Sequence, residues 1–326
     1  MKTRILGRTG FEVSEMGMGC WQLGGDFGPI EDATSQQALT AAREAGITFY
    51  DTADVYGAGR SEAQVGQFLK GAGAGSIVAT KVGRTEELYP DSYDRGAIAN
   101  HLRASAQRLG VDRLDLVQLH CVPPAVLEDG EIFSIMDEMV AEGLTAHWGA
   151  SVETLAEART CMAQPGCATL QIIFNLYRQN AGWEIFDAAK KQGVGIIVRL
   201  PLASGLLTGK YSKGHRFPES DHRNYNAEGA AFSVGETFSG IEMDAAVDAL
   251  DLVRPLVPEG MSLANFALRW ILDHDAVSTV IAGVSRPDQA LRNAAASELA
   301  PLGADVHAEL KRIYQAEIEP LVRCPI

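Results

Sequence analysis

Eight short apolar segments recur along this chain, and each is separated from the next by a segment with helix-forming composition. Short segments that are apolar throughout are typical of strands buried on both faces of a sheet. Strict alternation of strand and helix predicts parallel strands joined by right-handed crossovers. The expected strands are 16–21, 47–50, 76–79, 114–119, 145–150, 169–174, 194–198 and 279–282.

The expected helices follow from apolar periodicity and from residues that favour helix ends. The clearest helix covers 94–109, where Ile98 and Leu102 share one face and Gly110 follows the last turn. Ser61 is a suitable N-cap for the second helix. The full set of expected helices is 33–45, 61–69, 94–109, 132–140, 154–162, 184–192, 244–253, 262–272, 287–296 and 305–317.

Both an open doubly wound sheet and a closed barrel fit this alternation. Polar residues follow several different strands, and a barrel gathers such residues at one mouth, whereas an open sheet has its site at one switch point. We therefore predict an α/β fold, a (β/α)8 TIM barrel with an N-terminal β-hairpin over 2–13 and extra helices. The stretch 204–240 predicts a long loop after strand 7 that lies over the mouth. The absence of linker-like or repeated segments indicates a single domain over 1–326.

Charge and cysteine content exclude several classes of protein. The 28 Lys and Arg against 42 Asp and Glu give a net charge of −14, which disfavours nucleic acid as a partner because its binding needs a clustered basic face. Five irregularly spaced cysteines indicate reduced thiols. We find no apolar run long enough for a membrane span, no signal-peptide pattern and no metal-binding motif. A cytoplasmic protein without a metal ion is expected, and a homo-oligomer stays open.

Two glycine-rich segments resemble nucleotide-binding loops. The segment 71–76 follows an expected helix and precedes a strand, which is the reverse of the order that a dinucleotide fingerprint requires. The segment 204–211 lacks the first glycine of a P-loop and the Ser or Thr that follows its lysine, so nucleotide triphosphate hydrolysis is excluded. This second segment follows a strand directly, where backbone N–H groups can still bind phosphate.

Four residues suited to acid–base chemistry lie at or just after neighbouring strand ends: Asp51, Tyr56, Lys81 and His120. Each alone has an ordinary structural use, but together they predict one site. A tyrosine hydroxyl has a pKa of about 10, and a nearby ammonium lowers that pKa. We expect Lys81, held by Asp51, to tune Tyr56 as a general acid, with His120 polarising a carbonyl oxygen. Reduction of that carbonyl also needs hydride, which a nicotinamide supplies.

The segments 51–57, 59–62 and 115–120, together with Thr80-Lys81, resemble the aldo-keto reductase superfamily, and in particular a bacterial NADP-dependent subgroup. The resemblance extends from Leu6 to Asn293. It implies a (β/α)8 barrel that binds NADP(H) without a Rossmann fold. It implies Tyr56 as the proton donor, Lys81 and Asp51 as its tuning pair, and His120 as the residue that orients the carbonyl.

The resemblance also implies the contacts of a nicotinamide. Gln171 and Ser151 match residues that hold the carboxamide, while Val152 replaces the asparagine usual beside that serine. Arg199 stands where the family usually has an aromatic residue that stacks on the ring. A guanidinium plane can stack on a ring as well, although a positive charge there would bias the redox state of the nicotinamide.

Further cofactor contacts are implied along the rest of the dinucleotide. The segment 201–211 matches the loop that covers the pyrophosphate, and 283–293 matches the adenosine end, where Arg286 and the first turn of the next helix could hold a 2′-phosphate. The remaining implied cofactor-binding residues are Trp21, Pro201, Leu202, Ser204, Gly205, Leu207, Lys210, Gly283, Ser285, Arg286, Gln289 and Asn293.

The substrate side is expected to be formed by Trp21, Phe27, Tyr56 and His120, with Cys121 as a wall residue. The function that we predict is reduction of aldehydes or ketones to alcohols, with a small-molecule carbonyl substrate and NADPH, or NADH, as the cofactor. A rival is an NADPH-binding regulatory or sensor subunit with vestigial turnover, motivated by the departures at Val152 and Arg199. A lyase or isomerase that uses Lys81 as a Schiff-base amine is a third hypothesis, but it leaves the 283–293 match unexplained. The segment 221–223 resembles a bacterial subgroup without indicating a role.

Overall fold

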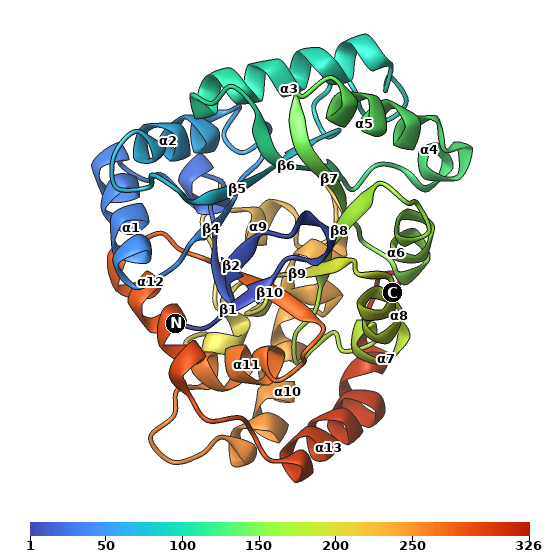
Figure 1. Ribbon diagram of the computed structural model, residues 1–326. Coiled ribbons are helices and arrows are strands. Elements are labelled where there is room, and N and C mark those ends of the chain that lie inside the picture. The colour runs from blue at the N-terminus through green and yellow to red at the C-terminus, as the bar shows by residue number, and fades with distance from the viewer.

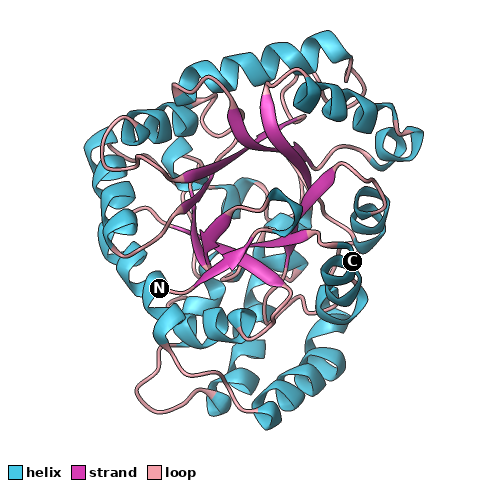
Figure 2. Ribbon diagram, in the orientation of Figure 1, coloured by secondary structure: helices cyan, strands magenta, loops and turns pink.

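The computed structural model describes all residues from 1 to 326, and its centre is a closed barrel of eight parallel strands (Figures 1 and 2). The last strand pairs in parallel with the first, so the predicted TIM barrel is confirmed and the open sheet is wrong. In barrel order the strands are β3 (Met16–Gly19), β4 (Phe49–Asp51), β5 (Ile77–Val82), β6 (Leu114–His120), β7 (Thr145–Ser151), β8 (Cys167–Ile173), β9 (Gly195–Arg199) and β10 (Val277–Gly283).

A ring of helices surrounds the barrel, and their apolar faces pack against the outer faces of the strands (Figure 2). The helices are α1 (Asp32–Glu44), α2 (Arg60–Leu69), α3 (Arg95–Leu109), α4 (Pro124–Asp129), α5 (Glu131–Ala141), α6 (Leu155–Met162), α7 (Ala181–Glu184), α8 (Phe186–Gln192), α9 (His222–Tyr225), α10 (Met243–Val253), α11 (Leu263–Leu272), α12 (Pro287–Ala294) and α13 (Ala304–Ile313).

Local capping chemistry explains several of these helix ends. The Asp94 side chain accepts a hydrogen bond from the Ala97 amide at the start of α3, and Gly110 ends that helix in the left-handed conformation. The predicted Ser61 cap is wrong, because Gly59 is the N-cap of α2. The Ser61 hydroxyl instead donates to the Cys20 carbonyl at 2.8 Å and thereby ties α2 to the barrel.

A few predicted boundaries also differ from the structure. The first barrel strand ends at Gly19, and Trp21 begins a 3-10 turn, Trp21–Gly24. The expected helix over 184–192 is split into α7 and α8, and the short helices α4 and α9 were not expected. None of these differences changes the order of the barrel strands.

The N-terminal hairpin closes one end of the barrel. Its strands β1 (Thr3–Ile5) and β2 (Glu12–Ser14) pair antiparallel and cross the near end of the barrel in Figure 1. Leu6 and Val13 pack on inward-facing residues of the strands. The turn needs glycine at position 7, because a Cβ there would lie 2.1 Å from the Gly195 amide nitrogen. The hairpin thus leaves only the opposite end open, where the strands have their C-termini and α9 lies.

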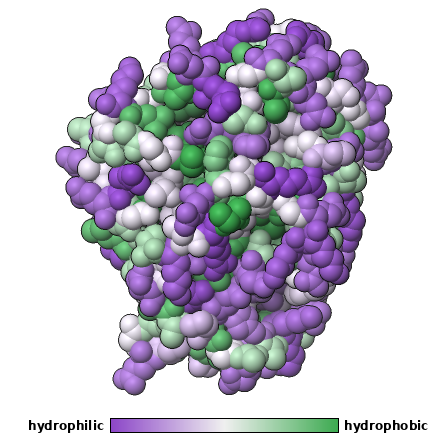
Figure 3. Space-filling view, in the orientation of Figure 1, coloured by the Kyte–Doolittle hydropathy of each residue, from purple (hydrophilic) through white to green (hydrophobic).

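The long segment after β9 supplies most of the cover over that open end. It contains three 3-10 turns, Ala203–Thr208, Val234–Glu236 and Phe238–Gly240, in addition to α9. Polar residues dominate the face shown in Figure 3, and apolar residues form only small separate patches on it. No helix has both the length and the apolar character that crossing a membrane would require.

Candidate active site

The open end of the barrel collects polar side chains from successive strands. Asp51, His120, Ser151 and Arg199 are the last residues of β4, β6, β7 and β9. The strand register places His120 opposite Ser151 and Ser151 opposite Gln171 of β8, so these three side chains form one row across adjacent strands. This register brings the polar strand ends together at the barrel mouth, as we expected from the sequence.

Lys81, on β5, connects the acid and the phenol. Its Nζ donates to Asp51 Oδ1 at 2.5 Å, to the Thr52 carbonyl at 2.8 Å and to Tyr56 Oη at 3.2 Å. The Lys81 side chain is 0% exposed, so this ion pair is shielded from water and strongly oriented. The predicted grouping of Asp51, Lys81 and Tyr56 is therefore one hydrogen-bonded unit in the structure.

The protonation states of this unit differ in part from the expected ones. Burial raises the pKa of Tyr56 to about 12, and the nearby Lys81 ammonium offsets only part of that rise. The expected lowering by Lys81 is present, but burial outweighs it. Burial alone would lower the pKa of Lys81, yet the charge of Asp51 holds it above its ordinary value. At neutral pH Tyr56 thus carries its proton beside a charged ammonium.

His120 is a neutral imidazole next to that phenol. Burial, together with the positive charges of Arg84, Lys81 and Arg199, holds the pKa of His120 well below its ordinary value. The ring of His120 lies edge-on to the Tyr56 ring, with 5.8 Å between the centroids. A neutral imidazole has one N–H to donate, and its Nδ1 has no hydrogen-bond partner in the protein.

The second carboxylate oxygen of Asp51 is held by two amides. Gln171 donates to Asp51 Oδ2 at 2.7 Å, and Gln118 of β6 donates to the same oxygen at 3.0 Å. The Ser151 hydroxyl donates to Gln171 Oε1 at 3.4 Å, which places the two predicted carboxamide-binding residues in contact. Sequence reasoning missed Gln118, although it is one of only two polar residues within an otherwise apolar strand.

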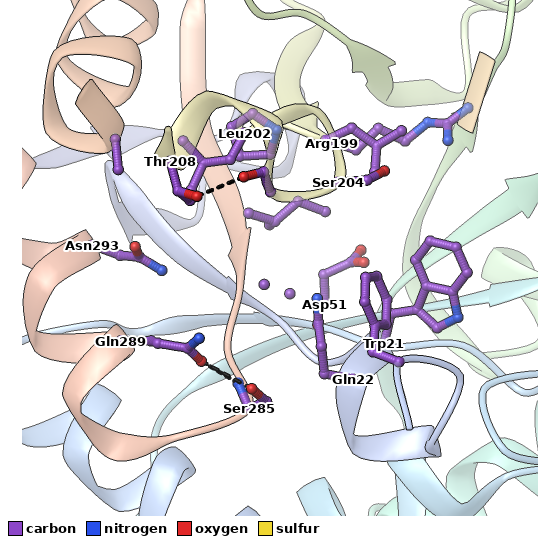
Figure 4. A pocket seen from close by; sticks show the side chains of 18 of the residues that line it. Trp21, Gln22, Asp51, Arg199, Leu202, Ser204, Thr208, Ser285, Gln289 and Asn293 are labelled. Carbon is purple, nitrogen blue, oxygen red and sulfur yellow. Dashed lines mark hydrogen bonds between the residues drawn. The ribbon is translucent and has the colours of Figure 1, made fainter. Parts of the chain in front are cut away.

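A cavity of about 560 Å³ runs from this unit along the mouth, within the usual size of ligand sites (Figure 4). In Figure 4, Trp21, Asp51 and Arg199 lie toward one end, and Gln289 and Asn293 lie toward the other. The predicted site residues that line the cavity are Trp21, Phe27, Asp51, Tyr56, His120, Ser151, Gln171, Arg199, Pro201, Leu202, Ser204, Gly205, Lys210, Gly283, Ser285, Arg286, Gln289 and Asn293.

Two predicted site residues do not line this cavity. Lys81 lies behind Tyr56 and Asp51 and is fully buried. Leu207, predicted as a cofactor contact, is also fully buried, and its amide already donates to the Leu202 carbonyl at 3.2 Å. Leu207 therefore has no free donor for a phosphate. Lining residues to which sequence reasoning assigned no role are Gln22, Arg223, Glu236, Asn265 and Arg292, among others.

The end of the cavity away from Tyr56 is suited to anionic groups. Arg286 and Arg292 are exposed there, each with a side chain that is 62% exposed. The Ser285 amide and hydroxyl both donate to Gln289 Oε1, which orders the first turn of α12. A side chain at Gly283 would collide with Gln22, since a Cβ there would lie 2.1 Å from Gln22 Nε2. Both arginines pair with Asp288, and two cations that share one carboxylate beside a helix start favour phosphate.

Arg199 lines the Tyr56 end of the cavity, but its guanidinium is engaged with protein groups. Nη2 donates to the Val152 carbonyl at 3.0 Å, and Nη1 lies 3.3 Å from Glu236 Oε1. Glu236 also pairs with Arg84 at 2.9 Å, and Arg84 pairs with Glu153 at 3.0 Å. Arg199 is thus tied to the backbone of residue 152 and to a largely buried network of ion pairs.

A second cavity of about 350 Å³ adjoins the first. Its walls combine the aromatic residues Tyr89, Tyr225 and Phe232 with the charged residues Arg84 and Glu153. Four residues line both cavities, and they are Trp21, Tyr56, His120 and Glu236. Cys121, predicted as a wall residue, lines the second cavity, and burial raises the pKa of its thiol to about 12.

The segment 221–223, whose role the sequence left open, fastens the long loop to the mouth. Asp221 caps α9 and pairs with Arg223, which donates to Tyr211 Oη at 2.7 Å. His222 is fully buried, with its ring centroid 4.6 Å from that of Trp21 and 4.3 Å from that of Phe27. This packing fixes two residues of the mouth.

Comparison with known proteins gives concordant results. The model of the Aldo/keto reductase family matches residues 15–315. A probable voltage-gated potassium channel subunit beta from Oryza sativa subsp. japonica is 30% identical over 319 residues, 93% of each chain. Aldo-keto reductase YhdN from Bacillus subtilis (strain 168) is 30% identical over 295 residues, 89% of this chain and 86% of the relative. The holo form of aldo-keto reductase AKR11C1 from Bacillus halodurans superimposes with a TM-score of 0.78 at 28% identity, over 96% of each chain. The chain belongs to the aldo/keto reductase family.

Proposed function

We propose that this protein is an NADPH-dependent reductase that converts aldehydes or ketones to alcohols. The observation that carries the proposal is the place of Tyr56, which lies where the two cavities meet and shares a hydrogen bond with the buried Lys81 ammonium. A substrate in the smaller cavity and a dinucleotide in the larger one would both reach this hydroxyl. The protein is proposed to act on small molecules in the cytoplasm.

The chain's own residues account for the proton side of such a reaction. When bound, the cofactor supplies hydride to the carbonyl carbon. Tyr56 Oη donates the proton that the developing alkoxide needs, and the Lys81 ammonium stabilises the resulting phenolate. The neutral His120 ring donates a hydrogen bond to the carbonyl oxygen and orients it. Asp51 keeps Lys81 charged and in place through the 2.5 Å contact.

The larger cavity fits a dinucleotide with its phosphates directed away from Tyr56. Hydride and proton add to the two atoms of one carbonyl group, so the nicotinamide must occupy the Tyr56 end. Ser151 and Gln171 line that end, and the Gln171 Oε1 and Ser151 hydroxyl oxygens can accept hydrogen bonds from a carboxamide. The exposed Arg286 and Arg292 at the other end support NADPH rather than NADH, because they match an additional 2′-phosphate.

The test is a comparison of Tyr56→Phe with the wild type on a panel of neutral aliphatic and aromatic carbonyl compounds. We expect NADPH oxidation to fall by about 10²–10⁴-fold, the usual contribution of a general acid, while the NADPH dissociation constant is unchanged. Tyr50→Phe is the matched control, because Tyr50 lies on β4, the strand that precedes Tyr56, and lines neither cavity. Wild-type turnover in Tyr56→Phe would overturn the proposal.

A second candidate is an NADPH-binding sensor subunit with vestigial turnover. It is favoured by the 30% identity to a probable potassium channel beta subunit and by the altered residues Val152 and Arg199. Tight NADPH binding with no turnover on any carbonyl compound would support it over the reductase. The third hypothesis, a Schiff-base amine at Lys81, is disfavoured since Lys81 lines neither cavity and its ammonium donates to three oxygens.

A further inference from the structure

Glu236 stands at the junction of the two cavities and is deeply buried, with a side chain that is 5% exposed. Two cations contact it, Arg84 on the side of the smaller cavity and Arg199 on the side of the larger one. Burial opposes ionisation of Glu236, but Arg84 and Arg199 outweigh burial and lower its pKa to about 2. Glu236 is therefore a carboxylate at neutral pH.

The backbone around Glu236 is fixed to the loop that begins after β9. The Ser204 hydroxyl donates to the Glu236 carbonyl and accepts from the Phe238 amide, each at 3.3 Å. Ser204, Phe238 and Ser239 all have positive φ angles, between 54° and 59°. Such conformations persist where surrounding contacts impose them. The carboxylate is thus held at a defined place rather than carried on a freely moving loop.

Arg199 poses an electrostatic difficulty for a reductase. It lines the end of the larger cavity where the proposed hydride transfer requires the nicotinamide, and that ring is cationic when oxidised and neutral when reduced. An uncompensated guanidinium would repel the oxidised ring and leave the reduced ring unaffected. Product nucleotide would then bind poorly, and the cavity would favour one redox state.

We propose that Glu236 is a positioning residue that sets the redox selectivity of the nucleotide site by neutralising Arg199 beside the nicotinamide. This inference rests on the proposed function. The carboxylate holds the guanidinium against the Val152 carbonyl and cancels its charge toward the ring. The altered position 199 and the acid at position 236 then form one functional pair, contributed by β9 and by the loop that follows it.

The experiment measures dissociation constants of NADPH and NADP⁺ by calorimetry for wild type and variants, and uses the ratio of the NADP⁺ constant to the NADPH constant. Glu236→Gln is expected to raise this ratio about tenfold, because the like charges of Arg199 and the oxidised ring are no longer compensated. Arg199→Gln is expected to lower the ratio, because Glu236 then faces the ring with only Arg84 as partner. The double variant is expected to return the ratio to within about twofold of wild type.

Asp273→Asn is the matched control, because Asp273 is also a largely buried acid paired with an arginine, Arg269 at 2.8 Å, and lines neither cavity. The ratio of the NADP⁺ constant to the NADPH constant should be the same in this variant as in the wild type. If Glu236→Gln does not fold, the expected fall of this ratio in Arg199→Gln still tests the inference. Equal weakening of both nucleotides in the single variants would overturn the inference and leave the proposed function standing. Failure of wild type to bind either nucleotide would overturn both.

Discussion

The two ends of the larger cavity are built from different parts of the fold. At the proton-donating end, Asp51, Lys81 and Gln171 are borne by strands and are at most 2% exposed. At the phosphate end, Arg286 and Arg292 belong to the start and the body of α12, and their side chains are 62% exposed. The buried end holds its groups in place before any ligand arrives. The exposed cations are held only by ion pairs with Asp288 at the surface, which contribute little.

This difference separates stability from affinity. Removing one member of a buried ion pair leaves an uncompensated charge, which destabilises the fold and disrupts the chemistry together. Removing an exposed arginine mainly lowers the affinity for the anion that the arginine would bind, and it changes stability little. Variants at the buried end should therefore lose both stability and turnover, whereas variants at the exposed end should lose only affinity for the nucleotide.

Lys81→Met is expected to cause the largest loss. The variant leaves the Asp51 carboxylate buried without its cation, and we expect the free energy of unfolding to fall by about 3–5 kcal/mol. NADPH oxidation should also fall by about 10²–10⁴-fold, as for loss of the proton donor. Denaturant unfolding and steady-state rates measure the two effects. Lys70→Met, at an exposed position after α2, is the control. Wild-type stability in Lys81→Met would show that the ion pair is not needed at this end.

The pH dependence of the two reaction directions should differ. With the pKa of Tyr56 raised to about 12 and that of His120 well below its ordinary value, both groups keep one protonation state between about pH 7 and 9. Carbonyl reduction needs the protonated phenol and should be flat over this range. Alcohol oxidation needs the phenolate, whose population rises about tenfold per pH unit below the pKa, so its rate should rise by about a hundredfold. A reduction rate that falls over the same range would contradict the raised pKa of Tyr56.

Arg286→Met is expected to have the smallest effect. We expect the dissociation constant of NADPH to rise by about tenfold, since an exposed charge-assisted contact is lost, while NADH affinity and the unfolding free energy stay unchanged. Titrations at low and high salt measure this change, and the difference between variant and wild type should shrink at high salt. Arg312→Met serves as the control, because Arg312 is also 62% exposed and does not line the cavity. Equal losses of NADPH and NADH affinity would exclude a 2′-phosphate contact.

The strand-borne part of the site was predictable because a strand end is visible in the sequence and the barrel register then dictates its neighbours. Asp51, His120 and Ser151 each close a strand, and their meeting needs no further information. The Arg84–Glu236 pair joins residues that are 152 positions apart. Both lie in loops, and the sequence near each residue does not predict how those loops fold toward one another.

The differences between expectation and structure have a similar origin in tertiary contacts. Ser61 has the chemistry of a helix cap, but its hydroxyl bonds to the barrel instead. Leu207 lies in a segment with the expected composition, yet the turn that contains it uses its amide internally. The direction of the pKa shift of Tyr56 depends on how fully the fold buries the phenol, which the spacing of Asp51, Tyr56 and Lys81 does not reveal.

The most direct test of the proposed carbonyl reduction is to follow hydrogen from the cofactor into the product. NADPH deuterated at both C4 positions of its dihydronicotinamide is incubated with the wild-type protein and the carbonyl panel, and the alcohols are analysed by mass spectrometry and NMR. We expect one deuterium on the former carbonyl carbon and a solvent-exchangeable hydrogen on the oxygen. Alcohol without deuterium at that carbon, or no alcohol from any carbonyl compound, would contradict the proposed reduction.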